Sequence, residues 1–279
     1  GTVRQFVRGL RVVTAAGKMV DLGGKYLKSS TGLHLLDLMI GSEGTLGLIT
    51  QVTFSLLPPP AAKMTLVVPF ATVVDAIQSV PALFDAGILP VAVEFVEEYI
   101  LAFSEHLVEK TWPAKQGEAS LLIILDGPGD EEIMLTAERV SNVLENQHAL
   151  DILVAEDREK QADILLIRSM IYEALRPGTA ELLDICVPRS EIAPHIVFLK
   201  ELEQRIGVRL PTYGHAGDGN VHTHILRRSI EGDTFGEEIS RWHDDLVTVR
   251  REVYDDTIRR GGVISGEHGV GLVKRNHIA

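Results

Sequence analysis

The sequence is poor in cysteine: Cys186 is its single thiol, so no internal disulfide can form. Cysteine pairs with zinc-ribbon spacing are absent as well, and a chain without disulfides is typical of a reducing compartment, so we expect a cytoplasmic protein. Long apolar runs are also missing. The longest uncharged stretch, residues 44–62, contains polar side chains and a proline triplet, which is the wrong composition for a membrane-spanning helix.

Positive charge is scarce too. Lys and Arg total 27 against 39 Asp and Glu, which gives a formal net charge of -12. A field of that sign repels phosphate backbones and anionic lipid surfaces, so we expect no nucleic-acid partner. A chain this acidic that binds a small anion must concentrate positive charge locally, through an arginine, a metal ion or a helix N-terminus.

The 279 residues, 45% of them hydrophobic, are enough to bury one sizeable core or two smaller ones. The chain opens on Gly1 directly before strand-like sequence, without an initiator methionine or a signal-type apolar segment, so we expect it to begin inside a domain. A proline triplet cannot continue a strand ladder, and Pro58–Pro60 is the best domain boundary in the sequence. The predicted domains are 1–58 and 59–279.

Strand-like and helix-like segments alternate along the chain, which predicts an α+β fold. Before the prolines, the pattern predicts a hairpin from 10–14 and 19–22, a short helix at 33–40 and a strand at 48–57. Three β-α-β passages follow, at 63–95, 120–155 and 183–213, and then a long helix at 236–260. Passages of this length favour a ferredoxin-like sheet with helices on one face.

Six of the ten histidines lie between His215 and His277. In the segment 214–224, apolar residues flank Gly217-Asp218-Gly219-Asn220, a composition that favours two strands joined by a tight turn. Such a hairpin would place His215 and His222 on neighbouring strands and let two imidazoles converge on a metal. In the glycine-dense loop 261–269, Glu267 would be the third ligand, and adjacent His268 a general base.

The residues by themselves also allow other interpretations. Histidines and Asp-Gly pairs also occur in ordinary packing and turn positions, and for His224 a ligand and a packing role weigh equally. Arg168 fits a clamp for a substrate carboxylate, a pair with a neighbouring acid, or an arginine that extends from a helix into solvent. The glycine-rich segment 41–47 lacks the lysine of a phosphate-binding loop and by itself indicates only a loop.

Taken in order, three motifs resemble the FAD-linked oxidases of the D-lactate dehydrogenase, glycolate oxidase and D-2-hydroxyglutarate dehydrogenase group, within the vanillyl-alcohol oxidase superfamily. They are the segments 40–47, 214–222 and 265–271. The resemblance covers essentially the whole chain. It implies the end of an FAD-binding domain at 1–58, followed at 59–279 by a ferredoxin-like α+β substrate-binding cap with a largely antiparallel sheet, truncated at its end.

The resemblance also implies roles for individual residues. His215, His222 and Glu267 match the ligands of a divalent metal, with zinc expected and manganese or iron as alternatives. His268 matches the catalytic base, and Arg168 the arginine that binds the substrate carboxylate. The residues implied to lie beside FAD are Ser42, Glu43, Gly44, Thr45, Gly47 and Ile49.

Three departures from the family pattern bear on the substrate. Leu165 stands where the family has a tryptophan, Leu182 lies where the hydroxyglutarate enzymes have a lysine, and His224 replaces their asparagine. These departures favour D-lactate or glycolate, oxidised to the 2-oxo acid with hydride passed to FAD. A metallohydrolase and a non-catalytic metal-binding cap or interaction fragment are the alternatives.

The resemblance further implies an external electron acceptor, such as a quinone, an electron-transfer flavoprotein, an iron-sulfur subunit or a cytochrome. Through that acceptor the protein would be peripheral to the membrane, and a homodimer is a further expectation. Because the N-terminal segment that holds the pyrophosphate loop in the family is absent from this chain, we expect the chain alone to hold FAD poorly and to be inactive.

Overall fold

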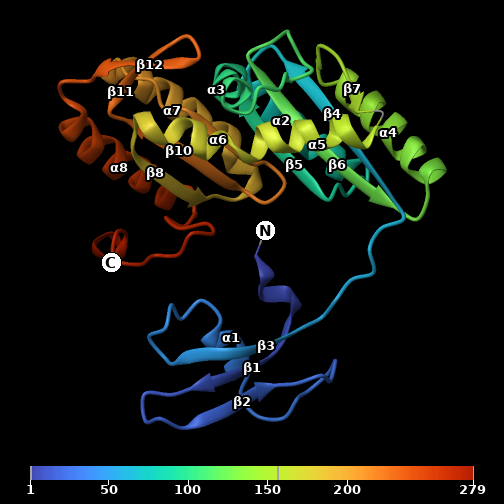
Figure 1. Ribbon diagram of the computed structural model, residues 1–279, viewed down its shortest axis with the longest axis vertical. Helices are drawn as coiled ribbons and strands as arrows, with labels where there is room; N and C mark the ends of the chain where they lie inside the picture. Colours follow the sequence, from blue (N-terminus) through green and yellow to red (C-terminus); the bar gives the residue numbers. More distant parts are fainter. Residues whose placement is uncertain (1, 156, 279) are drawn as a thin grey trace. The chain divides into compact units, whose positions relative to one another are not determined.

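The computed structural model describes residues 2–155 and 157–278, and the chain divides into two compact units (Figure 1). The first unit joins Gly1–Pro59 with Glu267–Ala279, and the second is Pro60–Gly266. The change of unit falls inside the proline triplet, where missing N–H groups prevent the chain from continuing a ladder. Within the described residues, no helix has the length and apolar character needed to span a membrane.

The first unit is built on a three-stranded antiparallel sheet in the order β2-β1-β3. A helical turn packs against it through Leu36 and Met39, which meet Val7, Leu10 and Val12 of the first strand in a small core. The predicted hairpin, short helix and following strand are therefore confirmed. The elements are β1 (Val7–Val13), β2 (Met19–Gly23), α1 (Leu35–Met39) and β3 (Leu48–Phe54).

The second unit contains a seven-stranded sheet in the order β7-β4-β6-β5-β9-β10-β8, in which every neighbouring pair is antiparallel. This arrangement confirms the predicted α+β fold with a largely antiparallel sheet. In chain order its strands are β4 (Ala62–Phe70), β5 (Ala92–Glu97), β6 (Ala119–Gly127), β7 (Leu153–Ala155), β8 (Thr179–Cys186), β9 (Thr212–His215) and β10 (Asn220–Leu226).

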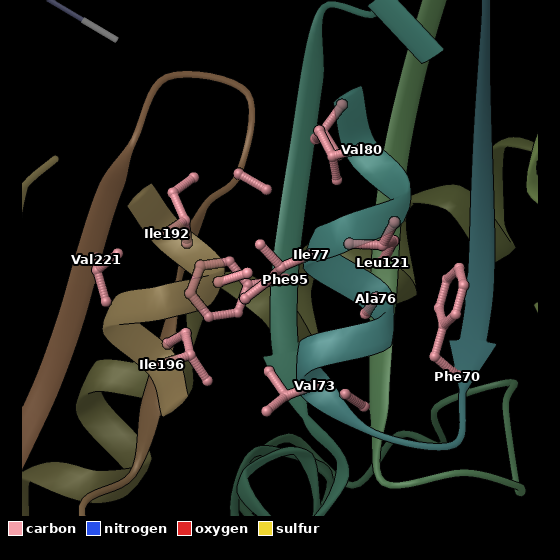
Figure 2. Close-up of a cluster of buried hydrophobic side chains, with 14 of the residues drawn as sticks. Phe70, Val73, Ala76, Ile77, Val80, Phe95, Leu121, Ile192, Ile196 and Val221 are labelled. Atoms are coloured by element: carbon pink, nitrogen blue, oxygen red, sulfur yellow. The ribbon is translucent and has the colours of Figure 1, made fainter. Parts of the chain in front are cut away.

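Four amphipathic helices cover one face of this sheet and enclose the main core. Figure 2 shows part of this core. Because strand side chains alternate, Phe70 and Phe95 point into this core while Val67 and Val96 point to the opposite face. The four helices are α2 (Val73–Asp85), α4 (Asp130–Glu145), α7 (Ile192–Ile206) and α8 (Trp242–Arg259).

Helices also cover part of the second face, beyond the single covered face that the sequence pattern predicts. They enclose a second core around Trp112, which is fully buried. These helices are α3 (Glu98–Val108), α5 (Arg158–Ser169) and α6 (Ile171–Leu175). A sheet covered on both faces explains why its strands are continuously apolar rather than alternating.

The predicted start of the last helix, at residue 236, is wrong. Residues there form a two-stranded hairpin of β11 (Arg228–Glu231) and β12 (Thr234–Glu238), and α8 begins only at Trp242. Phe235 of this hairpin packs on Phe103 of α3, with ring centroids 4.8 Å apart. The predicted end is confirmed, because α8 stops at Arg259 and Gly261 follows with φ +74°.

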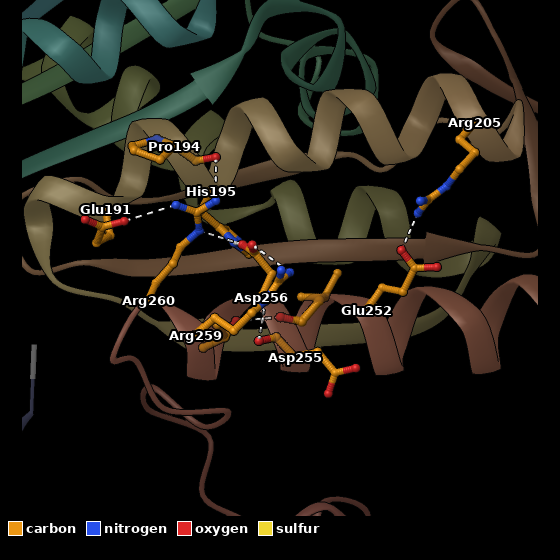
Figure 3. Close-up of polar contacts among 11 residues, drawn as sticks. Glu191, Pro194, His195, Arg205, Glu252, Asp255, Asp256, Arg259 and Arg260 are labelled. Carbon is orange, nitrogen blue, oxygen red and sulfur yellow. Dashed lines mark hydrogen bonds and ion pairs between the residues drawn. The ribbon is translucent and has the colours of Figure 1, made fainter.

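A buried polar network joins α7 to the end of α8 (Figure 3). His195 is fully buried, and its Nδ1 lies 2.7 Å from the Asp256 carboxylate, which also accepts from Arg260 Nε at 2.6 Å. Burial raises the pKa of the Asp256 carboxyl, but hydrogen bonds from His195 and Arg260 outweigh it and hold the pKa below its usual value. The network fixes the spacing of the two helices and agrees with a packing role for His195.

Glu98, the first residue of α3, makes the stability of the second unit depend on pH. Burial, followed by the negative charge of Glu105, raises the pKa of Glu98 to about 7. The folded protein therefore holds this proton more tightly than the unfolded chain, and stability falls as pH rises from about 4.5 to about 7.

We expect Glu98→Gln to flatten that pH dependence. Because the side chain is partly exposed, the variant should gain about 1 kcal/mol over the wild type at pH 8 and almost nothing at pH 4.5. Urea unfolding at the two pH values measures the difference. An equal gain at both would contradict the assignment to Glu98, and the exposed Glu131→Gln on α4 is the control.

Candidate active site

The register of the central strands gathers polar side chains on one face of the sheet. His222 pairs with Tyr213 on β9 and with Asp184 on β8, while His215 pairs with Asn220 on β10 and Glu94 on β5. Directly paired residues point to the same face, as do residues two apart on one strand. The face therefore presents Glu94, Asp184, Tyr213, His215, Asn220, His222 and His224.

The predicted histidine hairpin is confirmed. β9 and β10 are joined by a turn at 216–219, and Gly219 adopts φ +92°, a left-handed conformation in which a Cβ would lie 2.0 Å from the Val187 carbonyl oxygen. The imidazoles of His215 and His222 meet edge to face, with ring centroids 5.5 Å apart. His222 is 4% exposed, so one imidazole is buried while His215 keeps partial access to solvent.

Glu94 lies behind His215 and is a site residue that the sequence analysis missed. Its Oε1 is 2.6 Å from His215 Nδ1, and its Oε2 accepts from Arg168 at 2.5 Å. Burial raises the pKa of Glu94, but the His215 hydrogen bond and the Arg168 charge outweigh burial and keep the pKa below its usual value. A glutamate within the otherwise apolar stretch 92–96 was the sequence signal, since buried charges need partners.

Arg168 projects from the last turn of α5 and is held by Glu94, so the pair with a neighbouring acid, one of the interpretations left open from the sequence, is present. Its guanidinium also lies over the ring of Tyr213, 5.0 Å from the centroid. A guanidinium has five N–H donors, so the pair with Glu94 leaves donors for another group. Its role toward a substrate carboxylate stays a prediction.

Asp184 forms a second buried carboxylate at the site, also missed from the sequence. It is fully buried on β8, with Oδ1 3.8 Å from His222 Nδ1 and 2.8 Å from the Nδ2 of Asn220. Asn220 also donates to the Ile185 carbonyl oxygen at 2.8 Å. Gly266 packs directly on this pair, because a Cβ there would lie 1.8 Å from Asn220 Nδ2.

His224 takes a packing role in this arrangement. It is fully buried, its Nδ1 lies 2.8 Å from Thr179 Oγ1, and its Nε2 lies 3.3 Å from the hydroxyl of Tyr213. Burial, with a smaller contribution from the charge of His222, lowers the pKa of His224 to about 3, so the ring is neutral. Both nitrogens are engaged, which favours packing over the ligand interpretation.

The residues predicted to lie beside FAD, which are Ser42 to Thr45, Gly47 and Ile49, belong to a turn-rich segment that leads into β3 in the first unit. Gly41 and Gly44 have positive φ angles, and Gly47 lies so close to β1 that a Cβ would be 2.7 Å from Val12 Cγ1. Thr45 Oγ1 donates to the Ser42 carbonyl oxygen at 2.7 Å, and Ile49 is 45% exposed. None of residues 41–49 is buried, and most of them are exposed to solvent.

Glu43 connects two of the three sequence motifs. Its carboxylate accepts from the backbone N–H groups of Val270 and Gly271 at 2.6 and 2.7 Å. These hydrogen bonds, Val270 first, lower the pKa of the Glu43 carboxyl. Glu43 therefore holds the segment that follows the Glu267-His268 pair, a structural role in addition to the predicted cofactor contact.

Glu267 and His268 begin the C-terminal segment of the first unit. They follow Gly266, whose N–H donates to the Asp184 carbonyl oxygen at 3.3 Å. The side chains of Glu267 and His268 are 30% and 49% exposed, with His268 Nε2 3.8 Å from Glu267 Oε1. Their roles as metal ligand and base stay predictions.

The fold of the chain is similar to that of p-cresol methylhydroxylase. The structure of p-cresol methylhydroxylase with substrate bound superposes with a TM-score of 0.67 at 16% identity, over 94% of this chain and 58% of that one. Residues 59–279 match the family "FAD linked oxidases, C-terminal domain". The chain therefore belongs to the FAD-linked oxidase family.

Several curated proteins are similar to this chain over nearly its whole length. A D-lactate dehydrogenase of Archaeoglobus fulgidus is 38% identical over 100% of this chain and 59% of its own length. A D-lactate dehydrogenase of Anaerostipes hadrus is 35% identical over 100% of this chain and 59% of its length. The glycolate oxidase subunit GlcD of Bacillus subtilis is 32% identical over 100% of this chain and 57% of its length. The chain spans somewhat more than half of these relatives.

Proposed function

We propose that the full-length protein containing this chain oxidises a D-2-hydroxy acid of the D-lactate or glycolate type to the 2-oxo acid, with hydride passed to FAD. The observation that carries the proposal is the convergence of His215, His222 and, through Glu94, Arg168 on one face of the sheet. The names of the relatives support the same chemistry, since they include D-lactate dehydrogenases and a glycolate oxidase subunit.

The residues present fit a divalent metal. Imidazole nitrogen and carboxylate oxygen are the usual ligands of zinc, and both also suit manganese or iron. His215 and His222 each have a buried carboxylate on the Nδ1 side, the arrangement that supports metal-binding imidazoles elsewhere. We propose His215, His222 and Glu267 as the ligands. When bound, the metal supplies a Lewis acid that lowers the pKa of the substrate hydroxyl.

The protein groups bind and orient the substrate and move its proton. Arg168 would hold the substrate carboxylate with the donors that Glu94 leaves available, adding the positive charge that an acidic chain must localise. His268 would take the hydroxyl proton as general base. The loop 42–49 would lie along FAD, which when bound supplies the hydride acceptor. An external electron acceptor would then reoxidise the flavin.

The proposal is tested on the full coding sequence that contains residues 1–279. We expect a yellow protein with bound flavin and about one equivalent of divalent metal, whose flavin absorbance bleaches anaerobically with substrate. A colourless, metal-free protein would contradict the oxidase. Hydrolysis of esters or amides without flavin would support a metallohydrolase, and metal binding without any turnover would support a non-catalytic cap.

The same bleaching experiment compares the rates at which different hydroxy acids react. Leu182 pairs opposite His224 on the site face, and His224 is neutral, so these positions offer no cation for a second carboxylate. We therefore expect D-lactate or glycolate to bleach the flavin at least about 10-fold faster than D-2-hydroxyglutarate, since an unpaired buried charge costs more than 1.4 kcal/mol. Faster bleaching by D-2-hydroxyglutarate would reverse this assignment.

A further inference from the structure

One buried carboxylate, that of Glu94, contacts two groups of the proposed site. Glu94 lies on β5 in register with His215 on the adjacent strand. Its two oxygens divide the contacts, Oε1 to His215 Nδ1 at 2.6 Å and Oε2 to Arg168 at 2.5 Å. The side chains of Glu94 and Arg168 are only 12% and 15% exposed, so little solvent screens the pair.

A carboxylate in this position determines how the imidazole can act. With its Nδ1 hydrogen directed at Glu94, His215 is held in the tautomer that leaves Nε2 as the lone-pair nitrogen, and its ring cannot rotate without losing the bond. The second oxygen of Glu94 fixes one edge of the planar Arg168 guanidinium. The remaining N–H donors then point in one defined orientation toward a substrate carboxylate. Moving either partner would therefore disturb the other.

We propose that Glu94 is a positioning residue that couples the metal ligand His215 to the substrate-binding Arg168. The inference rests on the proposed function and goes beyond it, since it assigns a role to a residue that is neither a proposed metal ligand nor the proposed substrate-binding group. Loss of the Glu94 charge should weaken metal binding at His215 and substrate binding at Arg168 together.

The other histidine has a related arrangement, which supports this interpretation. The strand order is β5-β9-β10-β8, so each histidine strand has an outer neighbour. β5 provides Glu94 behind His215, and β8 provides Asp184 behind His222, with Oδ1 3.8 Å from Nδ1. Because the distance at Asp184 is longer, we expect loss of the Asp184 carboxylate to weaken metal binding less than loss of the Glu94 carboxylate does.

Glu97 provides a matched control on the same strand. It is three residues from Glu94 and as well buried, but it faces α7, where it pairs with Lys200 and accepts from the Thr212 N–H at 3.2 Å. Glu94→Gln and Glu97→Gln therefore both neutralise a buried, paired glutamate of β5. The two variants differ in that only Glu94 contacts His215 and Arg168.

The first test measures Zn²⁺ affinity by competition with a chromophoric chelator, on the wild type and both variants. We expect Glu94→Gln to lose about 10- to 100-fold in affinity, the range typical of partners behind a ligating histidine. Glu97→Gln should stay within about 3-fold, with circular dichroism confirming that both variants are folded. Equal losses in the two variants, or none in Glu94→Gln, would overturn the positioning role.

A second measurement does not depend on metal. Nitrogen-15 NMR of the metal-free protein should show the His215 proton on Nδ1 in the wild type and redistributed between the nitrogens in Glu94→Gln. An unchanged tautomer in Glu94→Gln would overturn the inference. If the wild type bound no Zn²⁺, the proposed metal site would fail, and this measurement would still decide whether Glu94 fixes His215.

The coupling to Arg168 is tested in the full-length protein. Glu94→Gln should raise KM for the hydroxy acid about 10-fold in the wild-type background. It should have little further effect on KM in an Arg168→Met background, because the two side chains act as one unit. Additive effects of the two substitutions would contradict the coupling.

Discussion

His222→Ala is expected to lower the affinity for divalent metal by more than about 100-fold, beyond the range typical of partners behind a ligand, and to abolish substrate-dependent flavin bleaching. The reason is positional. His222 lies in the middle of β10, 4% exposed, with its ring 5.5 Å from that of His215. Metal content by plasma emission spectroscopy and anaerobic bleaching of the full-length protein measure the two losses.

The control for this variant is His224→Asn, two residues along the same strand and face. His224 is engaged by Thr179 and Tyr213 through its two nitrogens, so its loss removes packing contacts but no proposed ligand. We expect this variant to retain its metal within about 3-fold of the wild-type affinity, well below the effect of a lost ligand. Retention of metal by His222→Ala, or its loss in His224→Asn alone, would reverse the assignment of the two histidines.

Gly266→Ala is expected to destabilise the protein by about 2–4 kcal/mol. Overpacking of a core costs about 1–3 kcal/mol, and a buried polar group that loses its hydrogen bond costs about as much again. The new Cβ would lie 1.8 Å from Asn220 Nδ2 and 2.9 Å from an oxygen of Asp184. Asn220 must then move, and its bonds to Asp184 and to the Ile185 carbonyl are lost. Urea unfolding followed by circular dichroism measures the change.

Gly217→Ala is the matched substitution for that experiment. Gly217 lies in the nearby β9–β10 turn, and a Cβ there meets its nearest neighbour at 3.7 Å, an ordinary contact. We expect a change within about 0.5 kcal/mol, as for substitutions that touch no buried feature. Adding Asn220→Ala to Gly266→Ala should relieve part of the clash, and a Gly266→Ala variant as stable as the wild type would show that the close packing is absent.

The sequence pattern predicts local structure well where one element decides it. Turn residues at 217–220 predict the histidine hairpin, and Gly261 marks the end of α8. The predicted start of α8 was wrong because Ile239, in the segment 236–241, continues the helical spacing of the apolar residues that follow. In the structure β12 pairs with β11 instead, and Phe235 gains a packing partner on α3. Tertiary contacts override a weak local preference of this kind.

The carboxylates behind the histidines illustrate what local pattern cannot predict. Glu94 is 121 residues from His215 and 74 from Arg168 along the chain, and Asp184 is 36 from Asn220. A single charged residue inside an apolar strand signals that some partner exists, but no spacing rule identifies which one. The identity of the partner depends on which strands become neighbours.

By itself the sequence determined the scarcity of positive charge, the α+β alternation, the histidine hairpin and the three motifs of the FAD-linked oxidase family. These features follow from composition, turn chemistry and residue spacing, which act over a few residues. Only the tertiary structure decided that β5 and β8 flank the hairpin and place Glu94 and Asp184 behind its two imidazoles. The reason is that strand order is set by burial of the whole sheet, which depends on contacts between distant parts of the chain.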